Sequence, residues 1–477
     1  MKTLTILFVA AIMMGVGCSK SEDNENNPDK PDKPSPLPDL PDPNDVCSCM
    51  DDIIFMQYCY DNFDVNKDGK VSQIEAAAVS EIDLTDFEIK TLTGIGYFSN
   101  LEILNCKGCK NLISVDLSNN LKISRIGDSA FDGCNDLSEI IFNTNIVEIG
   151  ESAFRNCSNL KRIDIPEKVT KLGIQVFERC DNLTSISIQG KVTEIGANAF
   201  SLCKSLENID IPETVTEIGA NAFWRCSNLK SIIIPRKVTE IGRSAFFGCS
   251  NLTSINIPKS VIEIGGGTFY NCSSLTNVTF EKESQLKSII SYGSDQVIFG
   301  NCPALTSIEI PASVETMEGP VFYNCSSLAS VTFAKGSQLK FVMWREGAVF
   351  KECTALTDIE IPASVETMEG PVFQNCSSLT KVIFEEGSYL KSMVGEIYSN
   401  CPALISIEIP ASIKKIANIV YNCNNLTHIY CHPIVPPEIT DTYWGCENFV
   451  LYVPSQSLEA YKNSRWSNYY SSIRAIE

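Results

Sequence analysis

The sequence has little of what catalytic or nucleic-acid-binding proteins carry. Only two of its 477 residues are histidine, and no Gly-x-Ser-x-Gly, P-loop or zincin motif occurs. Lys and Arg total 38 against 58 Asp and Glu, giving a net charge of −20; without a basic patch, this argues against binding to phosphate backbones. The apolar run over residues 4–16 is too short to span a membrane. These absences point away from an enzyme and from a nucleic-acid-binding protein.

Cysteine is abundant instead, and most of the 21 cysteines recur in one series. The first seven members are each 23 residues apart, and each has an aromatic residue three positions before it and a leucine three positions after it. The next seven continue the series with small departures from the 23-residue spacing. The series comprises Cys134, Cys157, Cys180, Cys203, Cys226, Cys249, Cys272, Cys302, Cys325, Cys353, Cys376, Cys401, Cys423 and Cys446. A fixed period of this length predicts a solenoid in which each repeat buries its face against the next.

Each repeat divides into three parts, as in LKRIDIP (160–166), VTKLG (169–173) and FERC (177–180). Leu-x-x-Ile-x-Ile alternates between two faces, which predicts a strand with one buried side, and proline ends that strand. Val-x-x-Ile-Gly returns on the far side, where we expect glycine to permit a tight turn, and Phe and Cys fill the interior. The sequence therefore predicts a β-rich repeat solenoid over residues 89–451, with about 14 rungs and a concave parallel sheet.

This repeat resembles the leucine-rich repeats of the BspA-like family of bacterial surface proteins. The resemblance covers residues 90–477, and VTEIGANAFSLC (192–203) and VTEIGANAFWRC (215–226) follow the family pattern closely. Residues 452–477 resemble the C-terminal cap of that family. The resemblance implies an extracellular, non-catalytic protein with a role in adhesion.

The cysteine series is interpreted as a column of buried free thiols. Equivalent residues of stacked strands lie about 4.8 Å apart, and free cysteine packs as a small apolar residue. Cys47, Cys49, Cys59, Cys106 and Cys109 stand outside the series, and disulfides among them are left open. The only His–Cys cluster, at 428–432, is interpreted as an ordinary strand and not as a metal site.

The N-terminus predicts export from the cell. Residues 1–17 have the form of a signal peptide, and the following Cys18 resembles the lipidated cysteine of bacterial lipoproteins; a plain signal without lipid, and hence secretion, is the alternative. Residues 18–46 are rich in Pro and Asp, which predicts a disordered spacer. Early acidic residues resemble surface-export signals of Bacteroidota lipoproteins, which implies the extracellular face of the outer membrane.

A calcium loop is predicted in the N-terminal cap, residues 47–88. Oxygen donors occupy loop positions 1, 3, 5 and 9, with glycine at 6 and glutamate at 12, as in an EF-hand. The predicted ligands are Asp64, Asn66, Asp68, Lys70 through its backbone carbonyl, Ser72 and a bidentate Glu75. Helices are expected over 51–63 and 72–82. Because no second loop is present in the sequence, a structural Ca²⁺ is expected; a solvated turn without metal is the alternative.

Partner binding is predicted on the concave sheet, where the two residues flanking the first Ile of Leu-x-x-Ile-x-Ile face outward. The face is polar and mildly acidic, which suits a protein partner better than a glycan. The predicted residues are Arg162, Asp164, Asn208, Asp210, Asn256, Asn277, Glu309, Asp358, Glu360, Lys381 and Glu408. A merely solvated sheet is the alternative.

A second candidate is the edge formed by insertions between Cys272 and Cys401, where Tyr292 and Trp344 are expected to be exposed. Duplication without function is the alternative there. Three hypotheses follow: a lipid-anchored adhesion protein that binds host or neighbouring-cell proteins, a surface lipoprotein that captures glycans or peptides for an outer-membrane uptake system, and a structural coat component.

Overall fold

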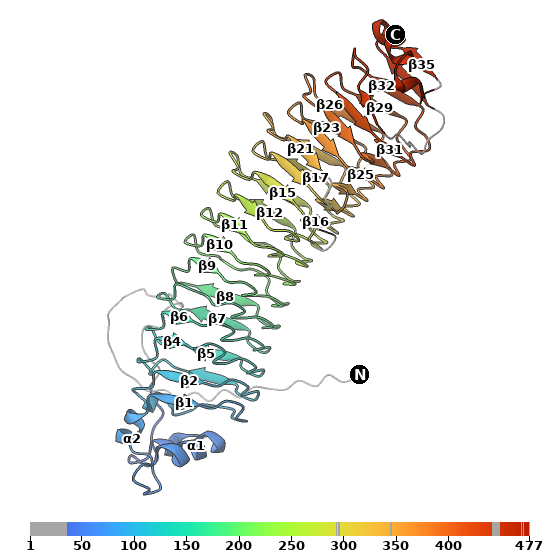
Figure 1. Cartoon of the computed structure of the whole chain (residues 1–477). Coiled ribbons are helices and arrows are strands. Elements are labelled where there is room, and N and C mark those ends of the chain that lie inside the picture. The colour runs from blue at the N-terminus through green and yellow to red at the C-terminus, as the bar shows by residue number, and fades with distance from the viewer. Residues whose placement is uncertain are drawn as a thin grey trace, which may run out of the picture. The chain divides into compact units, whose positions relative to one another are not determined.

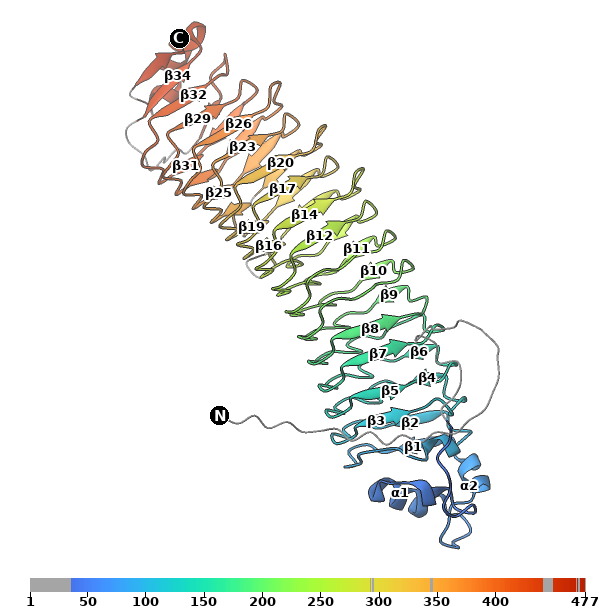
Figure 2. The same ribbon diagram turned by 180° about the vertical axis from the view of Figure 1, so that it is seen from behind.

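Parallel strands stack into an elongated solenoid of about 17 turns in a computed structural model of the protein (Figures 1 and 2). The structure describes residues 36–291, 293, 296–343, 346–440, 449–468, 470 and 472–476. The predicted solenoid is confirmed, and it has more turns than the cysteine series because turns before Cys134 and after Cys423 also contribute strands. No helix in these ranges is long and apolar enough to cross a bilayer.

The first sheet is the column of Leu-x-x-Ile-x-Ile strands. It consists of β3 (Ser114–Asp116), β5 (Glu139–Ile141), β7 (Arg162–Ile165), β8 (Ser185–Ile188), β12 (Ser254–Ile257), β14 (Asn277–Phe280), β17 (Ser307–Ile310), β20 (Ser330–Phe333), β23 (Asp358–Ile361), β26 (Lys381–Phe384), β29 (Ser406–Ile409), β32 (His428–Cys431), β34 (Val450–Val453) and β35 (Ile473–Ala475). Hydrogen-bonded pairs such as β7–β8 are parallel and in register, so equivalent residues of successive turns form rows.

The second sheet is the column of Val-x-x-Ile-Gly strands, and a third sheet forms from the Phe-x-x-Cys segments in the C-terminal half. The second consists of β1 (Glu81–Asp83), β2 (Ile103–Asn105), β4 (Arg125–Ile126), β6 (Glu148–Ile149), β9 (Glu194–Ile195), β10 (Glu217–Ile218), β11 (Glu240–Ile241), β13 (Glu263–Ile264), β15 (Ser288–Ile290), β18 (Thr316–Glu318), β21 (Phe341–Met343), β24 (Thr367–Glu369), β27 (Ser392–Val394), β30 (Lys415–Ala417) and β33 (Glu438–Ile439). The third consists of β16 (Phe299–Gly300), β19 (Phe322–Tyr323), β22 (Phe350–Lys351), β25 (Phe373–Gln374), β28 (Tyr398–Ser399) and β31 (Val420–Tyr421).

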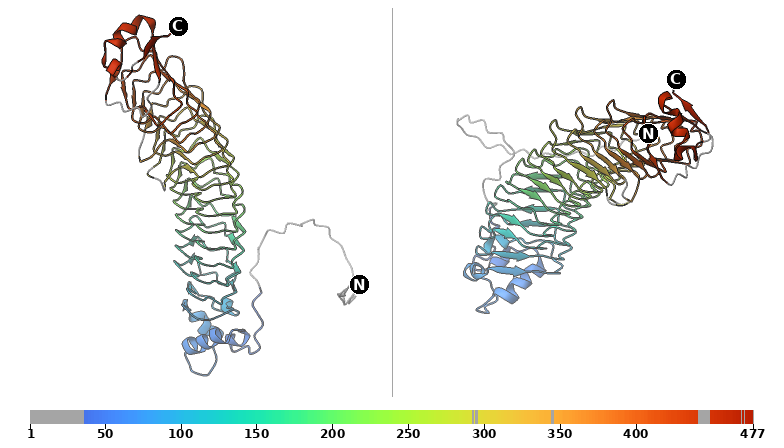
Figure 3. Two further views of the ribbon diagram at one scale, coloured as in Figure 1. Left: turned by 90° about the vertical axis from the view of Figure 1, so that its right-hand side faces the viewer. Right: turned by 45° about the horizontal axis from the view of Figure 1, so that its top comes forward.

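Short helices lie at both ends of the stack (Figure 3). They are η1 (Val46–Cys49), α1 (Ile53–Phe63), α2 (Gln73–Ala78) and η2 (Ile95–Tyr97) at the N-terminal end, and η3 (Ser455–Ser457), α3 (Leu458–Lys462) and η4 (Arg465–Asn468) at the C-terminal end. The helix expected over 72–82 is shorter than predicted, because residues 81–83 form β1 and pair with β2. At the other end, Tyr461 Oη and Trp466 Nε1 donate to the carbonyls of Pro433 and Pro437 at 2.9 and 2.8 Å.

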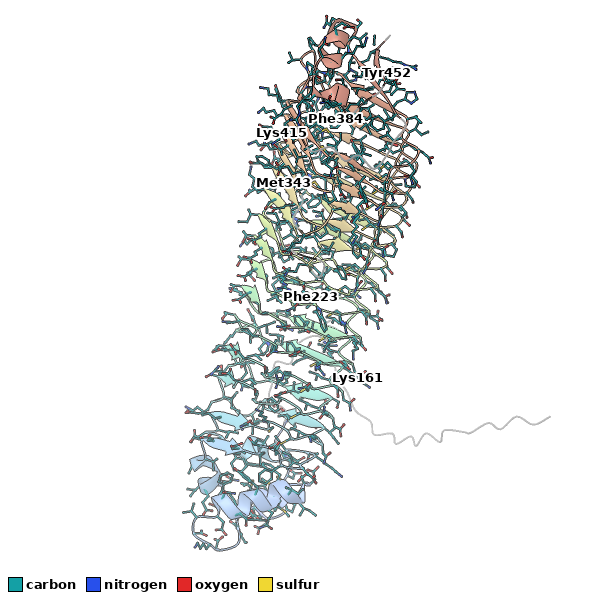
Figure 4. All side chains as sticks on the ribbon, turned by 45° about the vertical axis from the view of Figure 1, so that its right-hand side comes forward. Lys161, Phe223, Met343, Phe384, Lys415 and Tyr452 are labelled. Carbon is teal, nitrogen blue, oxygen red and sulfur yellow. The ribbon has the colours of Figure 1, made fainter. Side chains whose placement is uncertain are left out.

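The core contains one continuous stack of aromatic rings. Twelve rings lie with centroids 5.3–5.9 Å apart and planes within 16° of parallel. They are Phe131, Phe154, Phe177, Phe200, Phe223, Phe246, Phe269, Phe299, Phe322, Phe350, Phe373 and Tyr398. Figure 4 labels Phe223, a member of this stack, together with Met343 and Lys415 of the second sheet. Because every ring packs on the rings of both neighbouring turns, the turns share a single core.

The glycines that end the second-sheet strands have a different role from the one we predicted. A Cβ on Gly242 would lie 2.5 Å from the backbone nitrogen of Ala220, so glycine is needed there for close approach of two turns. The left-handed backbone of the corner belongs to later residues, such as Asn198 (φ 54°) and Asn221 (φ 55°). Asparagine tolerates this conformation better than most residues with a side chain.

The first sheet is divided into two-strand units in the C-terminal half. β12–β14, β17–β20 and β23–β26 form separate hydrogen-bonded pairs, and β29 begins a longer sheet. Each break follows a strand that ends in phenylalanine, at Phe280, Phe333 or Phe384, and is followed by a longer loop in place of the usual proline. The duplicated insertions recognised in the sequence therefore interrupt the pairing of the sheet.

Candidate binding surfaces

The predicted partner-binding residues point away from the core of the first sheet. In β7 the pattern is exposed, buried, exposed, buried, which places Arg162 and Asp164 outward; their side chains form an ion pair at 3.2 Å. The other predicted residues are likewise exposed, and Glu408 is half-exposed. They are Asn208, Asp210, Asn256, Asn277, Glu309, Asp358, Glu360, Lys381 and Glu408. Asn208 and Asp210 keep this outward position although no regular strand forms there.

Hydrogen bonds between turns order part of this outward face. Ser231 Oγ donates to Asn208 Oδ1 at 3.2 Å, and Thr279 Oγ1 donates to Asn256 Oδ1 at 2.9 Å. These bonds run along the rows and hold short polar side chains in fixed positions. The face is therefore a preorganised polar surface, which lowers the entropy cost of binding a partner.

Aromatic side chains gather at the C-terminal end of the same face. Tyr430 and Tyr452 are register partners on β32 and β34, and their rings stack at 5.0 Å. His428 lies 5.6 Å from the ring of Tyr452. Tyr452 is labelled in Figure 4. None of these three residues is among the predicted partner-binding residues; aligning residues 450–453 with the repeat would have revealed the cluster.

Two clefts open along the first sheet where the two-strand units meet. The larger, about 670 Å³, is lined by residues of β14, β17, β20 and the loops that follow them. The second, about 550 Å³, is lined by residues of β26, β29 and the loop after β32. Glu309 lines the first and Glu408 the second. In the second cleft, His432 Nε2 lies 2.6 Å from Glu408 Oε2.

Several candidates of the sequence analysis lie outside the described residues. These are the lipidation candidate Cys18, the edge-loop candidates Tyr292 and Trp344, and Cys446 of the cysteine series.

The predicted calcium loop folds around its own side chains. Asp64 Oδ2 accepts from the backbone nitrogen of Gly69 at 2.9 Å, and Asn66 Oδ1 accepts from that of Asp68 at 2.9 Å. Gly69 has a φ of 82° and Lys67 a φ of 60°, so both take the left-handed conformation. The loop thereby turns the side chains of positions 1, 3 and 5 toward its interior.

Glu75, the last predicted ligand, closes the loop. Its Oε1 accepts from the backbone nitrogens of Val65 and Asn66 at 3.0 and 3.2 Å, and its Oε2 accepts from Ser72 in a capping box that starts α2. Hydrogen bonds from the Ser72 backbone and side chain lower the pKa of Glu75. Over the described part of the chain, no three His, Cys, Asp or Glu side chains form a ready metal-holding group. The loop's remaining oxygen donors come from Asn66, Ser72 and the Lys70 carbonyl.

Residues before the cap fasten this loop. Lys70 Nζ forms an ion pair with Asp42 at 2.7 Å, and the backbone nitrogen of Val46 donates to the carbonyl of Val71 at 2.8 Å. Asp45 Oδ1 accepts from the backbone nitrogen of Val71 at 3.1 Å. The last residues of the segment expected to be a disordered spacer thus contact the loop.

The cysteine series forms a column of thiol hydrogen bonds. The series members from Cys134 to Cys401 are free thiols, which confirms the prediction for these residues. Cys157, Cys180, Cys203, Cys226, Cys249, Cys272, Cys302 and Cys325 donate to aromatic-residue carbonyls of the preceding turns at 2.9–3.2 Å. Burial raises the pKa of the Cys272 thiol to about 12, so this thiol stays protonated. The His–Cys cluster lies in strand β32 and the loop after it, as predicted.

The stacked turns and rows of outward side chains define an extended repeat scaffold. The chain belongs to the BspA-type leucine-rich-repeat family, whose model matches residues 102–230, 216–341 and 346–443, more than half of its length. This repeat family implies a role in protein interaction or surface adhesion and consists of typically non-catalytic scaffolds.

Three solved structures are similar to this chain, and the first of them shares its fold. A leucine-rich-repeat protein from Bacteroides ovatus is 24% identical, with 84% of this chain and 85% of that chain covered and a TM-score of 0.55. A leucine-rich cell surface protein from Faecalibacterium prausnitzii is 26% identical, covering 65% and 83%, with a TM-score of 0.35. The pneumococcal vaccine antigen PcpA is 20% identical, covering 66% and 89%, with a TM-score of 0.35. No match is found among curated proteins.

Proposed function

We propose that this protein is a cell-surface adhesion or interaction lipoprotein that binds proteins of a host or neighbouring cell through the outward face of the first sheet. The observation that carries the proposal is the row arrangement of exposed polar side chains on strands that stack in register. Such a surface is long and held in register over many turns, which suits recognition of a protein better than conversion of a small substrate.

The proposed location is the extracellular side of the outer membrane. Support comes from the signal-like residues 1–17, the cysteine that follows them and the Pro- and Asp-rich spacer. The printed description of the Faecalibacterium relative as a cell surface protein agrees with this location. Lipid attachment at Cys18 would leave the solenoid on a tether, and labelling with a radioactive fatty acid, lost in Cys18→Ser, tests it.

Calcium is the proposed ligand of the 64–75 loop, with a structural role. The inward side chains of Asp64, Asn66 and Asp68 and the two positive-φ residues support it. Hard oxygen donors suit Ca²⁺. The ion would order the cap that packs on the first turn, where Asp52 Oδ2 accepts from the backbone nitrogen of Lys90 at 2.7 Å.

The decisive experiment is binding of the immobilised protein, with and without Ca²⁺, to panels of matrix proteins, mucins and soluble glycans. We expect saturable binding to a protein of the panel, weakened by the paired charge reversal Glu309→Lys and Glu360→Lys. Glu217→Lys on the second sheet is the matched control and should leave binding unchanged. Binding to glycans alone would contradict the proposal and favour the nutrient-capture hypothesis.

A further inference from the structure

The two clefts of the first sheet are copies of one structural feature. The first follows β14 and the second follows β26, and in both the strand ends in phenylalanine, Phe280 or Phe384, instead of Ile-Pro. Both clefts open onto the next turn, which carries the identical sequence Ile-Glu-Ile-Pro-Ala-Ser at 308–313 and 407–412. A surface that repeats a cleft is suited to a ligand that repeats a chemical group.

Each cleft presents an outward carboxylate at the same position. Among the described residues, Glu309 forms no hydrogen bond or ion pair, and Glu408 forms one, with His432. On the opposite wall, Glu281 and Glu385 are held by backbone nitrogens of neighbouring turns at 3.2 and 2.8 Å. Lysines also border the clefts, at 282 and 335 in the first and at 381 in the second. Carboxylates exceed lysines in each cleft, which favours a cationic group of the ligand.

The second cleft adjoins an open aromatic face. Tyr430 is the register partner of Glu408 on one side and of Tyr452 on the other. Tyr452 stacks on one face of the Tyr430 ring at 5.0 Å, and the ring of His428 lies parallel to it at 6.1 Å. The ring face away from Tyr452 is on the side of the turn that carries Glu408. A guanidinium group can lie on that face while it binds the carboxylate, whereas an ammonium group matches this planar arrangement less well.

The distance between the clefts sets the spacing of the ligand's cations. Glu309 and Glu408 are four turns apart along the first sheet. The second sheet stays paired over the same turns, from β18 to β30, so the spacing is taken from it. At about 4.8 Å per turn the two carboxylates are separated by about 19 Å, which an extended chain at about 3.3 Å per residue spans with six residues. Residues i and i+6 of an extended strand project to the same side, whereas i and i+5 project to opposite sides.

We propose that the two clefts bind an extended polypeptide segment of the partner through two arginines six residues apart, with the Tyr430 cleft as the stronger subsite. The inference rests on the proposed protein-binding function and names the chemistry of its partner. A linear glycan fits less well, because the stacking of Tyr430 on Tyr452 leaves a single ring face and because the first cleft offers carboxylates without an exposed aromatic ring.

Fluorescence anisotropy with short labelled peptides tests the spacing and the charge. The probe is a 14-residue Gly/Ser/Thr peptide with arginines at i and i+6. Matched peptides carry arginines at i and i+5, or citrulline, which keeps the shape of arginine without its charge. We expect the i, i+6 peptide to bind the full protein about tenfold more tightly than either control.

Variants locate the site. Glu309→Gln and Glu408→Gln should each lower the affinity for the i, i+6 peptide about fivefold to tenfold. Tyr430→Leu should also lower this affinity, whereas Tyr430→Phe should leave it unchanged. Glu217→Gln, on the second sheet and outside the proposed binding face, is the control and should have no effect. Equal binding of the citrulline peptide, indifference to the two glutamates, or a linear oligosaccharide that binds through them would overturn the proposal. If panel proteins still bind in such a case, only this inference fails; if none binds, the proposed function fails as well.

Discussion

Removal of one ring from the core stack should weaken the solenoid locally. Phe223 is fully buried and stacks on Phe200 at 5.3 Å and on Phe246 at 5.4 Å. Phe223→Ala should lower the free energy of unfolding by about 3–5 kcal/mol, because a buried apolar ring is removed and a cavity remains. This figure includes the two lost ring pairs, at about 0.5–1.5 kcal/mol each. Because turns contact only their neighbours, we expect the free energy of local opening to fall by about 4 kcal/mol around residues 200–246 and to change little at either end.

Native-state hydrogen exchange followed by mass spectrometry measures this effect peptide by peptide. Phe247→Ala is the matched control: Phe247 follows the stacked ring of the next turn, is only half-buried, and stacks on Tyr270 at 5.2 Å. Phe247→Ala should lower the free energy of unfolding by about 1–2 kcal/mol, because folding removes less of this ring's apolar surface from water. Equal losses for the two variants, or faster exchange spread evenly along the chain, would refute the assignment of stability to the buried stack.

Three further predictions concern thiols, charge and calcium. With a pKa of about 12, the Cys272 thiol is ionised in only about one molecule in 10⁴ at pH 8. A thiol reagent should therefore label the partly exposed Cys49 first, and the buried cysteine series only after denaturation. Burial, followed by repulsion from the in-register glutamates of neighbouring strands, raises the pKa of Glu240. The folded state is therefore favoured below the ordinary glutamate pKa, and this advantage is lost as pH rises. Because Glu240 is exposed, solvent screens most of the effect, and Glu240→Gln should stabilise the protein by at most about 0.5 kcal/mol at pH 7 and by nothing near pH 3 in urea titrations. Calorimetry should detect Ca²⁺ binding with a Kd of about 10⁻⁴–10⁻³ M, and Asp64→Ala should abolish this binding. A heat signal that stays the same in Asp64→Ala would exclude the loop as the calcium site.

The repeat made most of the fold predictable. The 23-residue period gave the solenoid, and the alternation of Leu-x-x-Ile-x-Ile assigned buried and outward positions correctly even at Asn208 and Asp210, where no regular strand forms. The thiol column was predictable because equivalent residues of parallel turns must lie above one another. Both inferences depend on local periodicity, which a single sequence displays directly.

The clefts and the aromatic cluster were not predictable in the same way. The insertions after Phe280 and Phe384 were visible, but their effect on sheet pairing depends on how each loop packs over the next turn. The role of glycine was misassigned because positive φ and close approach leave the same sequence signature; only the 2.5 Å contact at Gly242 distinguishes them. Tyr452 was missed because residues 452–477 were interpreted as a cap, although β34 continues the first sheet.

The proposed calcium loop, at residues 64–75, is held in place by the N-terminal segment. EF-hand loops generally occur in pairs, so a single loop lacks the backbone partner of a second hand. Here the carbonyl of Val71 accepts from Val46, and its backbone nitrogen donates to Asp45. Tyr60 Oη also donates to Asp45 at 2.7 Å, which connects the same carboxylate to α1. Asp45→Ala should therefore loosen the loop even without Ca²⁺, seen as faster exchange of residues 64–75, whereas Asp61→Ala on the exposed side of α1 should not. An unchanged exchange rate in Asp45→Ala would mean that the loop holds its shape through its internal hydrogen bonds alone.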